Sequence, residues 1–243
     1  MNIALIGYGR MGKEVERLAR ERGHRVVACV DSKTSSLSPE IAREADVAIH
    51  FAVPSSVVGH VEQWAGFGKD IVVGTTGWSA ELGKVQAIVG AVKIGLVHAS
   101  NFSLGVNILF NLLTHAGTLV NKLDEYDVFL HEIHHKDKID SPSGTALTLA
   151  GILLNTVRRK REILSDAPKG KIKPEQLHIA STRGGAVVGT HRVTFDSVAD
   201  TIEITHTAKN RTGFALGALL AAEWVRGKHG LFTMEDVLED IRK

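Results

Sequence analysis

The strongest constraint on the fold is a glycine-rich turn near the N-terminus. Gly7-Tyr8-Gly9-Arg10-Met11-Gly12 follows the apolar run 2–6, and apolar residues then recur at helical spacing as far as Gly23. A second apolar run, 26–30, ends on Asp31. An acid about 20 residues beyond the glycines, in the order strand, glycine turn, helix, strand, is the fingerprint of a dinucleotide-binding βαβ unit. A plain glycine turn without a nucleotide is the less favoured interpretation.

Three more apolar runs, at 46–51, 70–73 and 93–97, predict further parallel strands, with helices at 54–65 and 78–89 between them. Ligands of open parallel sheets bind beyond the carboxyl ends of the strands. His50 and His98 lie near those ends and are expected to be structural histidines. The residues expected to line the rim beside the glycine turn are Phe51, Gly74, Thr75, Thr76, Ala99, Ser100, Asn101 and Phe102.

The second half of the chain has a different pattern. The predicted elements are helices at 104–120 and 146–154, strands at 126–134, 176–182, 189–195 and 201–207 with hairpin-like spacing, and helices at 212–226 and from 233. The fold class is therefore α/β: a Rossmann-type parallel-sheet domain plus a second α+β domain with a mostly antiparallel sheet. We expect 1–102 and 214–243 to form the dinucleotide-binding domain, and 103–213 to form the second domain.

Composition excludes several classes of partner. A net charge of +2 over 243 residues gives no basis for binding nucleic acid or a membrane surface. No apolar segment is long enough to span a bilayer, and no signal-peptide pattern opens the chain. The single cysteine, Cys29, excludes an internal disulfide and fits a reducing cytoplasm.

The segment 132–146, with the sequence EIHHKDKIDSPSGTA, carries the residues suited to chemistry. It predicts a strand end that bears titratable side chains, followed by a turn that opens a helix. The first amides of a helix lack partners, and the dipole is positive there, so the turn suits an anion. A small anionic substrate below a proton donor is the arrangement that this pattern favours.

Histidine suits proton transfer at neutral pH, and Lys138 can supply charge to a carboxylate or a second proton. Ser143, Gly144 and Thr145 offer amides and a hydroxyl to that carboxylate. A metal site is not expected, because the pattern His-x-x-His-His at 131–135 lacks a cysteine partner. Strand alternation would also send its last two histidines to opposite faces. Two merely structural histidines remain an alternative.

The sequence closely resembles the dihydrodipicolinate reductase family. Residues 132–146 match the family motif E-x-H-H-x-x-K-x-D-x-P-S-G-T-A throughout, and the family's N-terminal glycine motif appears at 7–12. The family's G-T-T-G appears at 74–77 and its N-F-S-x-G-V-N at 101–107. The resemblance covers essentially the whole chain, and the central motif is long and specific.

The resemblance implies the reduction of 4-hydroxy-tetrahydrodipicolinate to tetrahydrodipicolinate, in lysine and diaminopimelate biosynthesis. Hydride would pass from NADH or NADPH to C4 of a small cyclic dicarboxylate, and the resulting enamine would be protonated at C3. His134 would be the acid, Lys138 the second proton donor, and His135, Gly144 and Thr145 substrate ligands. The cofactor would contact 7–12, Asp31, 74–76, 99–102 and Phe214. The family is usually a homotetramer joined through its sheet domains.

Cofactor preference is left open by two departures from the family. Ser32 and Lys33 stand where some members carry arginine after the strand-2 acid, and Val53 stands where some carry arginine beyond the rim phenylalanine. Asp31 repels a 2′-phosphate and Lys33 can offset that repulsion, so both NADH and NADPH are expected.

Two other classes of protein remain as alternatives. Another two-domain NAD(P)-dependent dehydrogenase of amino-acid metabolism is one, although a phosphorylating semialdehyde dehydrogenase needs a nucleophilic cysteine and Cys29 is misplaced for that role. The other is a non-catalytic redox sensor that binds NADH. Such a sensor would carry a DNA- or partner-binding module, and the sequence contains no basic recognition helix.

Overall fold

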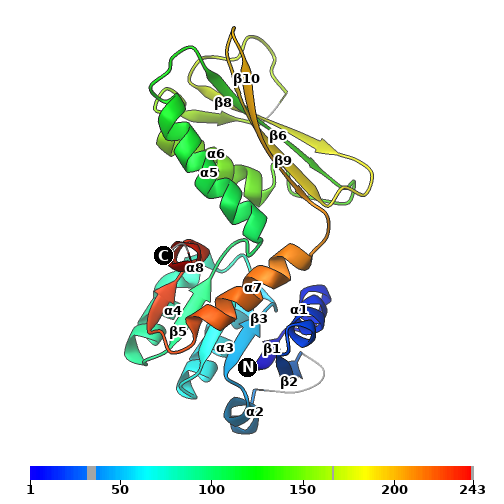
Figure 1. Cartoon of the computed structure of the whole chain (residues 1–243), viewed down its shortest axis with the longest axis vertical. Coiled ribbons are helices and arrows are strands. Elements are labelled where there is room, and N and C mark those ends of the chain that lie inside the picture. The colour runs from blue at the N-terminus through cyan, green and yellow to red at the C-terminus, as the bar shows by residue number, and fades with distance from the viewer. Residues whose placement is uncertain (32–36, 166, 242–243) are drawn as a thin grey trace. The chain divides into compact units, whose positions relative to one another are not determined.

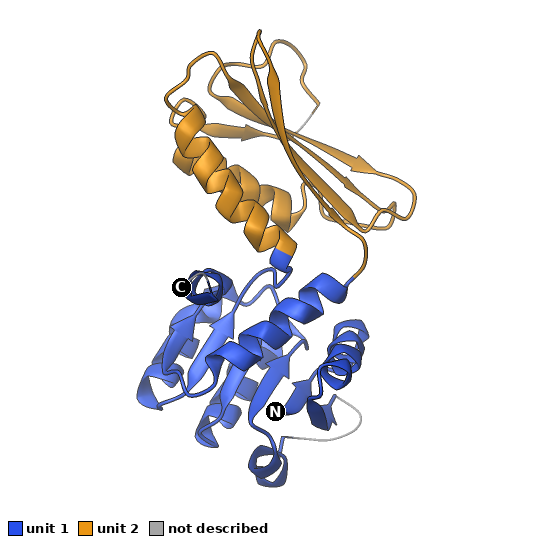
Figure 2. Cartoon of the chain, in the orientation of Figure 1, with its two compact units in different colours: residues 1–104, 211–243 blue, residues 105–210 orange. Residues whose placement is uncertain are grey.

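The computed structural model describes residues 1–31, 37–165 and 167–241. The chain divides into two compact units, 1–104 with 211–243 and 105–210 (Figure 2). None of the described helices is both long enough and apolar enough to cross a membrane.

The first unit is built on a six-stranded sheet in which every pairing is parallel (Figure 1). The order is β11-β5-β4-β3-β1-β2. The strands are β1 (Asn2–Ile6), β2 (Arg25–Val30), β3 (Val47–His50), β4 (Asp70–Val73), β5 (Gly95–His98) and β11 (Gly230–Phe232). The chain order reverses on the two sides of β1, and this is the point at which such sheets bind their ligands.

Helices cover both faces of this sheet because its strands are apolar on both sides. In β1, Ile3 and Leu5 face one buried cluster, whereas Ala4 and Ile6 face another. One face is covered by α1 (Arg10–Glu21), α7 (Thr212–Val225) and α8 (Met234–Ile241). The other is covered by α2 (Pro39–Glu44), α3 (Val57–Gly66) and α4 (Leu82–Ala91), the last two preceded by the 3-10 turns Pro54–Ser56 and Ser79–Glu81.

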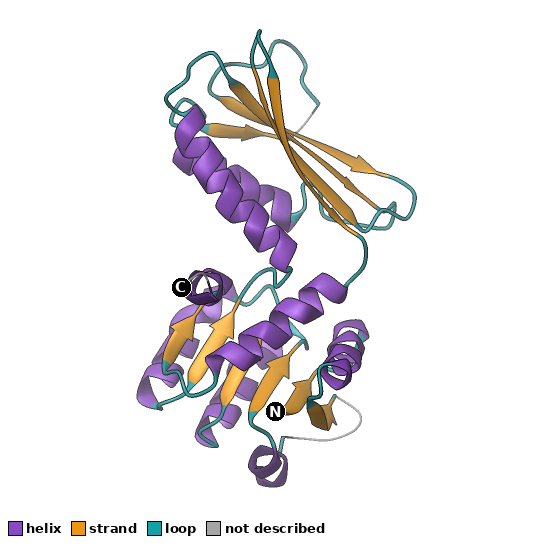
Figure 3. Ribbon diagram, viewed as in Figure 1, coloured by secondary structure: helices purple, strands orange, loops and turns teal. Residues whose placement is uncertain are grey.

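The second unit has a five-stranded mixed sheet in the order β10-β9-β6-β8-β7. Its strands are β6 (Asp127–His134), β7 (Glu162–Leu164), β8 (Gln176–Arg183), β9 (Gly189–Asp196) and β10 (Thr201–Ala208). One face packs on α5 (Leu104–Val120) and α6 (Gly144–Thr156), as Figure 3 shows. The two units together confirm the predicted class of a parallel α/β sheet with a second α+β unit.

One pairing in this sheet differs from the prediction. The spacing of 176–182 and 189–195 predicts a hairpin, but β6 lies between β8 and β9 and pairs with both. The chain leaves β6, forms α6 and β7, and returns in β8 parallel to β6, as a helical crossover requires. The short loop after β8 then passes over the end of β6. The central position of β6 surrounds its last residues with side chains from both neighbours.

Candidate active site

The end of β6 places two titratable residues on the face that packs on the helices. Glu132 and His134 are two residues apart, so strand alternation puts them on one face, and they are 1% and 6% exposed. His131 lies on the opposite face, where its Nε2 is 3.0 Å from the Thr182 hydroxyl. The structure therefore confirms that His134 shares the strand face of Glu132.

Glu132 is held by three donors on a single carboxylate oxygen. Oε1 accepts hydrogen bonds from the Ser143 amide at 3.0 Å, the Ser181 hydroxyl at 2.8 Å and the Arg183 guanidinium at 2.8 Å. Burial alone would raise the pKa of this carboxyl, but the donors outweigh burial and lower the pKa to about 2. The side chain is therefore a buried carboxylate at any pH near neutral.

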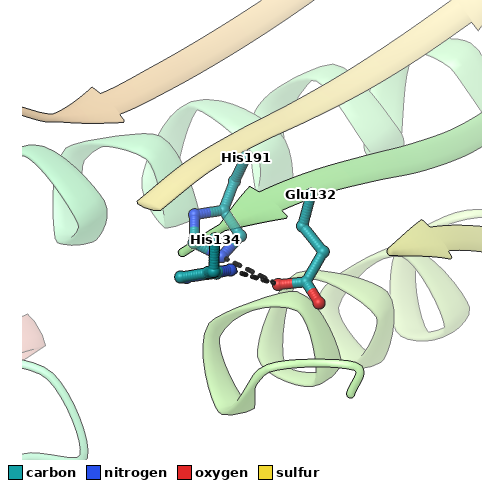
Figure 4. Close-up of side chains that lie close together, drawn as sticks. All are labelled: Glu132, His134 and His191. Atoms are coloured by element: carbon teal, nitrogen blue, oxygen red, sulfur yellow. Dashed lines mark ion pairs between the residues drawn. The ribbon is translucent and has the colours of Figure 1, made fainter. Parts of the chain in front are cut away.

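The second oxygen of this carboxylate faces His134 (Figure 4). Oε2 of Glu132 is 3.1 Å from His134 Nδ1 and 3.7 Å from His191 Nε2. Burial lowers the pKa of His134, and the charges of Lys138 and Arg183 lower it further, against an opposing contribution from Glu132. In the free protein the imidazole is therefore mostly neutral at neutral pH. A proton on Nδ1 would face the carboxylate and leave Nε2 for a ligand.

Two residues of β9 complete the surroundings of this histidine, and the sequence analysis missed both. A Cβ added to Gly189 would lie 2.9 Å from His134 Nε2, so only glycine leaves room for the ring there. His191 packs edge-on against His134 with ring centroids 5.1 Å apart, and burial lowers its pKa to about 4. The sequence Gly189-Thr190-His191 could have indicated these residues, because a glycine two residues before a histidine places both on one face of a strand. Their contact with His134 follows only from the pairing of β9 with β6.

The turn before α6 is ordered by Ser143. Its hydroxyl accepts a hydrogen bond from the Ala146 amide, caps the helix, and lies 3.1 Å from His191 Nε2. Its own amide donates to Glu132. Both polar groups of this buried serine are thus used inside the protein. Gly144, by contrast, is exposed, and a Cβ there would meet no described atom within 4 Å.

Lys138 lies on the turn that joins β6 to α6. Its ammonium group is 2.7 Å from Asp140 Oδ1, and the hydrogen bond from Lys138 lowers the pKa of that carboxyl. Arg183 donates to the Asp140 carbonyl at 2.6 Å and so ties this loop to the Glu132 carboxylate. His135 is half-buried, and its carbonyl accepts from the Lys138 amide at 3.2 Å. The loop therefore places Lys138 close enough for its charge to lower the pKa of both His134 and His191.

Glu132, His134 and His191 also have the donor types of a metal site, and one atom of each lies within 4.8 Å of the others. This set differs from the 131–135 histidine pattern considered in the sequence. Arg183 already brings a positive charge to the same carboxylate. That charge weakens the site for a second cation.

The glycine turn of the first unit has the geometry of a nucleotide cradle. Gly7 has φ +96°, and a Cβ there would lie 2.2 Å from the Phe51 carbonyl oxygen. A Cβ on Gly12 would lie 2.3 Å from the Gly7 carbonyl oxygen. Gly9 differs, because a Cβ there would meet no described atom within 4 Å. It begins α1 without a side-chain cap, so the open space beside it suits a pyrophosphate at the helix N-terminus.

The other predicted cofactor residues of this unit are found at the same ends of the strands. The Phe51 amide donates to the Ile6 carbonyl at 2.7 Å, and the Gly74 amide donates to the His50 carbonyl at 2.9 Å. Thr75, Phe102 and Ser103 are buried there. Thr76 and Ser100 are exposed, and Ala99 and Asn101 are half-buried. Asp31 follows β2, and Phe214 is half-buried in α7.

In the glycine turn, Tyr8 donates to Glu16, Arg10 is exposed and Met11 is half-buried. Lys33 lies outside the described residues.

Comparison with known proteins gives a consistent result. The family described as dihydrodipicolinate reductase, N-terminus, matches residues 1–102, and the one described as dihydrodipicolinate reductase, C-terminus, matches 105–238. A 4-hydroxy-tetrahydrodipicolinate reductase of Christiangramia forsetii is 43% identical over 100% of both chains. One from Akkermansia muciniphila is 37% identical over 95% of this chain and 94% of its own. A solved dipicolinate-bound dihydrodipicolinate reductase from Paenisporosarcina sp. TG-14 shares the fold, with a TM-score of 0.78 at 22% identity over 96% of this chain and 97% of that chain.

Proposed function

Because the chain belongs to the dihydrodipicolinate reductase family, we propose that the buried Glu132–His134 pair is the proton-donating centre of its reaction. That reaction is the NAD(P)H-dependent reduction of 4-hydroxy-tetrahydrodipicolinate in lysine biosynthesis. The observation that carries the proposal is the 3.1 Å approach of Glu132 Oε2 to His134 Nδ1 inside the sheet face. Membership in a family of reductases leaves a non-catalytic NADH sensor without support.

His134 donates the proton that the substrate needs at C3. Loss of the C4 hydroxyl and a C3 hydrogen as water turns the substrate into a conjugated cyclic imine, and NADH or NADPH, when bound, would supply the hydride to C4 of that imine. Glu132 holds the Nδ1 proton, fixes the ring and stabilises the imidazolium, so that Nε2 carries the transferable proton. Gly189 has no side chain beside Nε2, and this leaves room for the imidazole ring on that side.

The substrate is a small cyclic dicarboxylate, and the solved relative bound to dipicolinate supports that class. One carboxylate is held by Lys138 and the N-terminus of α6, through Gly144 and Thr145, with His135 as a further ligand. Ser143 acts mainly by shaping the turn, because its amide and hydroxyl bond within the protein. Lys138 exchanges its Asp140 partner for the substrate and is the second proton donor.

The cofactor lies along the carboxyl ends of the first sheet. Residues 7–12 receive the pyrophosphate at the N-terminus of α1, and Asp31 accepts from the adenosine ribose. Phe51 and the segments 74–76 and 99–102 line the nicotinamide side, with Phe214 from α7. Lys33 balances Asp31, so the enzyme uses both NADH and NADPH.

The enzyme acts in the cytoplasm as a homotetramer joined through its second units. The family resemblance and the single cysteine support this assignment. Size-exclusion chromatography with light scattering tests it directly, and a monomer at micromolar concentration would contradict it.

The proton assignment is tested with His134→Gln and with His131→Gln, a matched control three residues earlier on the opposite face of β6. Glutamine keeps a donor of similar size but cannot deliver a proton. The loss of nicotinamide absorbance with the freshly made substrate measures kcat, and fluorescence titration measures NADH affinity. We expect His134→Gln to lower kcat by about 10²–10⁴-fold with unchanged NADH affinity, and the control to stay near wild type. Near-normal kcat in His134→Gln would move the acid role to another group.

A further inference from the structure

A third buried histidine lies behind the cofactor rim of the first unit. His50 is the last residue of β3 and is 0% exposed. Its Nδ1 is 2.8 Å from the Thr75 hydroxyl, and its Nε2 is 3.0 Å from Nδ1 of His60 on α3. Burial lowers the pKa of His50 to about 4, so the ring is a neutral hydrogen-bonding group. None of the roles assigned above uses it.

The hydroxyl of Thr75 joins two rim segments. It accepts a hydrogen bond from the Ala52 amide at 3.0 Å and lies 3.4 Å from the Ala52 carbonyl oxygen. A hydroxyl has one proton, and the shorter contact, to His50 Nδ1, is the better acceptor position. His50 then carries its own proton on Nε2 and donates it to His60. The chain His60–His50–Thr75–Ala52 thus has a donor and an acceptor at each step.

The two segments joined in this way are in close contact. A Cβ added to Gly74 would lie 2.1 Å from the Phe51 ring, so that ring packs directly on the backbone of the next rim segment. The Phe51 ring also meets Phe102 edge-on, with centroids 6.4 Å apart. A small change in the separation of 51–52 from 74–76 would therefore move the aromatic wall of the rim.

We propose that His50 is a positioning residue for cofactor binding: through Thr75 it fixes the segment after β3 against the segment after β4. The inference rests on the proposed assignment of this rim to the nicotinamide side of the cofactor. Any buried histidine needs a hydrogen-bond partner for each nitrogen, and such partners alone indicate only a structural role. The Thr75 hydroxyl is different, because it also binds the backbone of the neighbouring rim segment at Ala52.

Three substitutions distinguish the role of His50 Nδ1, which contacts Thr75, from that of Nε2, which contacts His60. In His50→Asn the amide group can occupy the place of Nδ1 and keep the Thr75 contact, whereas His50→Gln reaches toward His60 and loses Thr75. His50→Leu loses both. NADH affinity is measured by fluorescence titration, kcat and KM by nicotinamide absorbance, and folding by circular dichroism and thermal unfolding.

We expect His50→Leu and His50→Gln to bind NADH about tenfold more weakly, with KM for NADH raised and kcat at saturating NADH retained. His50→Asn should stay within about threefold of wild type, because it keeps the bond that reaches the rim. A merely structural role would instead lower the unfolding temperature of all three without this order in affinity.

A folded His50→Leu enzyme with wild-type NADH affinity would overturn the proposal, as would a glutamine variant that binds as tightly as the asparagine variant. If the leucine variant does not fold, the asparagine–glutamine comparison decides. Failure of the proposed cofactor site is distinguishable, because it would show in enzymes that keep His50. In those enzymes, substitutions along the glycine turn would leave NADH affinity unchanged.

Discussion

Glu132→Gln tests the central pair with the smallest change in shape. The amide oxygen can still accept from Ser143, Ser181 and Arg183, but an NH₂ group then faces His134 in place of Oε2. Two donors would oppose each other unless the imidazole moves its proton to Nε2. The amide then accompanies a neutral ring, but no carboxylate remains to stabilise the imidazolium. Arg183, which is half-buried, also loses its counter-charge.

The magnitude follows from the 3.1 Å separation of Glu132 Oε2 and His134 Nδ1. With an effective dielectric constant of about 20, a carboxylate attracts an imidazolium at that distance by about 5 kcal/mol, and the cost of burying the pair offsets part of this. A loss of about 2.7 kcal/mol from the charged transition state lowers kcat by roughly 10²-fold. We expect at least that decrease, with NADH affinity unchanged.

The same substitution has a second consequence, in stability against pH. The pKa of Glu132 is about 2 in the folded protein, below its ordinary value of 4.5. A depressed carboxyl pKa stabilises the folded state above pH 4.5, and that stabilisation is lost as pH falls from 4.5 toward 2. The difference corresponds to at most about 3 kcal/mol. Glu132→Gln should therefore unfold at lower urea concentration at neutral pH and lose less stability on acidification.

The control is Glu203→Gln on β10, which removes an exposed ion pair with Arg192 in the same sheet. Such pairs contribute about 0–1 kcal/mol, so kcat and stability should stay near wild type. Steady-state kinetics and urea titrations at several pH values measure both effects. A Glu132→Gln enzyme with kcat within about threefold of wild type would refute the argument that this carboxylate stabilises the protonated acid.

Three further changes should have distinct effects. Gly189→Ala puts a methyl group 2.9 Å from His134 Nε2 and should lower kcat by about tenfold by displacing the ring, without changing NADH affinity in a fluorescence titration. Lys138→Ala should raise KM and lower kcat, and should weaken competitive inhibition by pyridine-2,6-dicarboxylate; unchanged inhibition would exclude Lys138 as a carboxylate ligand. Lys33→Ala should weaken binding of NADPH but not of NADH, because only the 2′-phosphate needs the charge, and equal loss for both would contradict that role.

Most of the fold follows from the period of apolar residues. Five of the six strands in the first sheet and the 104–120 helix lie where the pattern places them. The elements that the pattern missed are short: α2, β7 and β11 have six, three and three residues. A segment of that length contains too few residues to show a period, and its structure is decided by the neighbour on which it packs.

The position of β6 between β8 and β9 could not be predicted from spacing. A loop of a few residues usually joins adjacent strands, which favours a hairpin. Here the parallel return through α6 places β8 on one side of β6, and β9 must occupy the other. The choice depends on burial of the α5 and α6 faces, a tertiary property that no local window of sequence contains.

This topology also explains which part of the site the sequence could predict. Glu132, His134 and Lys138 come from one contiguous motif, and their side-chain types suggest their chemistry. The residues that contact this motif come from other parts of the chain. The strand register pairs Glu132 with Ser181 on one side and His191 on the other, and pairs His134 with Arg183. The carboxylate therefore meets its hydrogen-bond partners because it lies on the central strand of three.

A depressed histidine pKa is compatible with the acid role once the substrate's charge is considered. In the free site, burial and the cations Lys138 and Arg183 oppose protonation of His134, while Glu132 favours it. In the proposed complex the substrate adds two carboxylate charges near Lys138 and the imidazole, and this negative charge raises the pKa of His134. The proton is then held most firmly when substrate is present. Glu132 keeps its charge at any pH near neutral, so the rise in the pKa of His134 comes from the ligand and not from titration of Glu132.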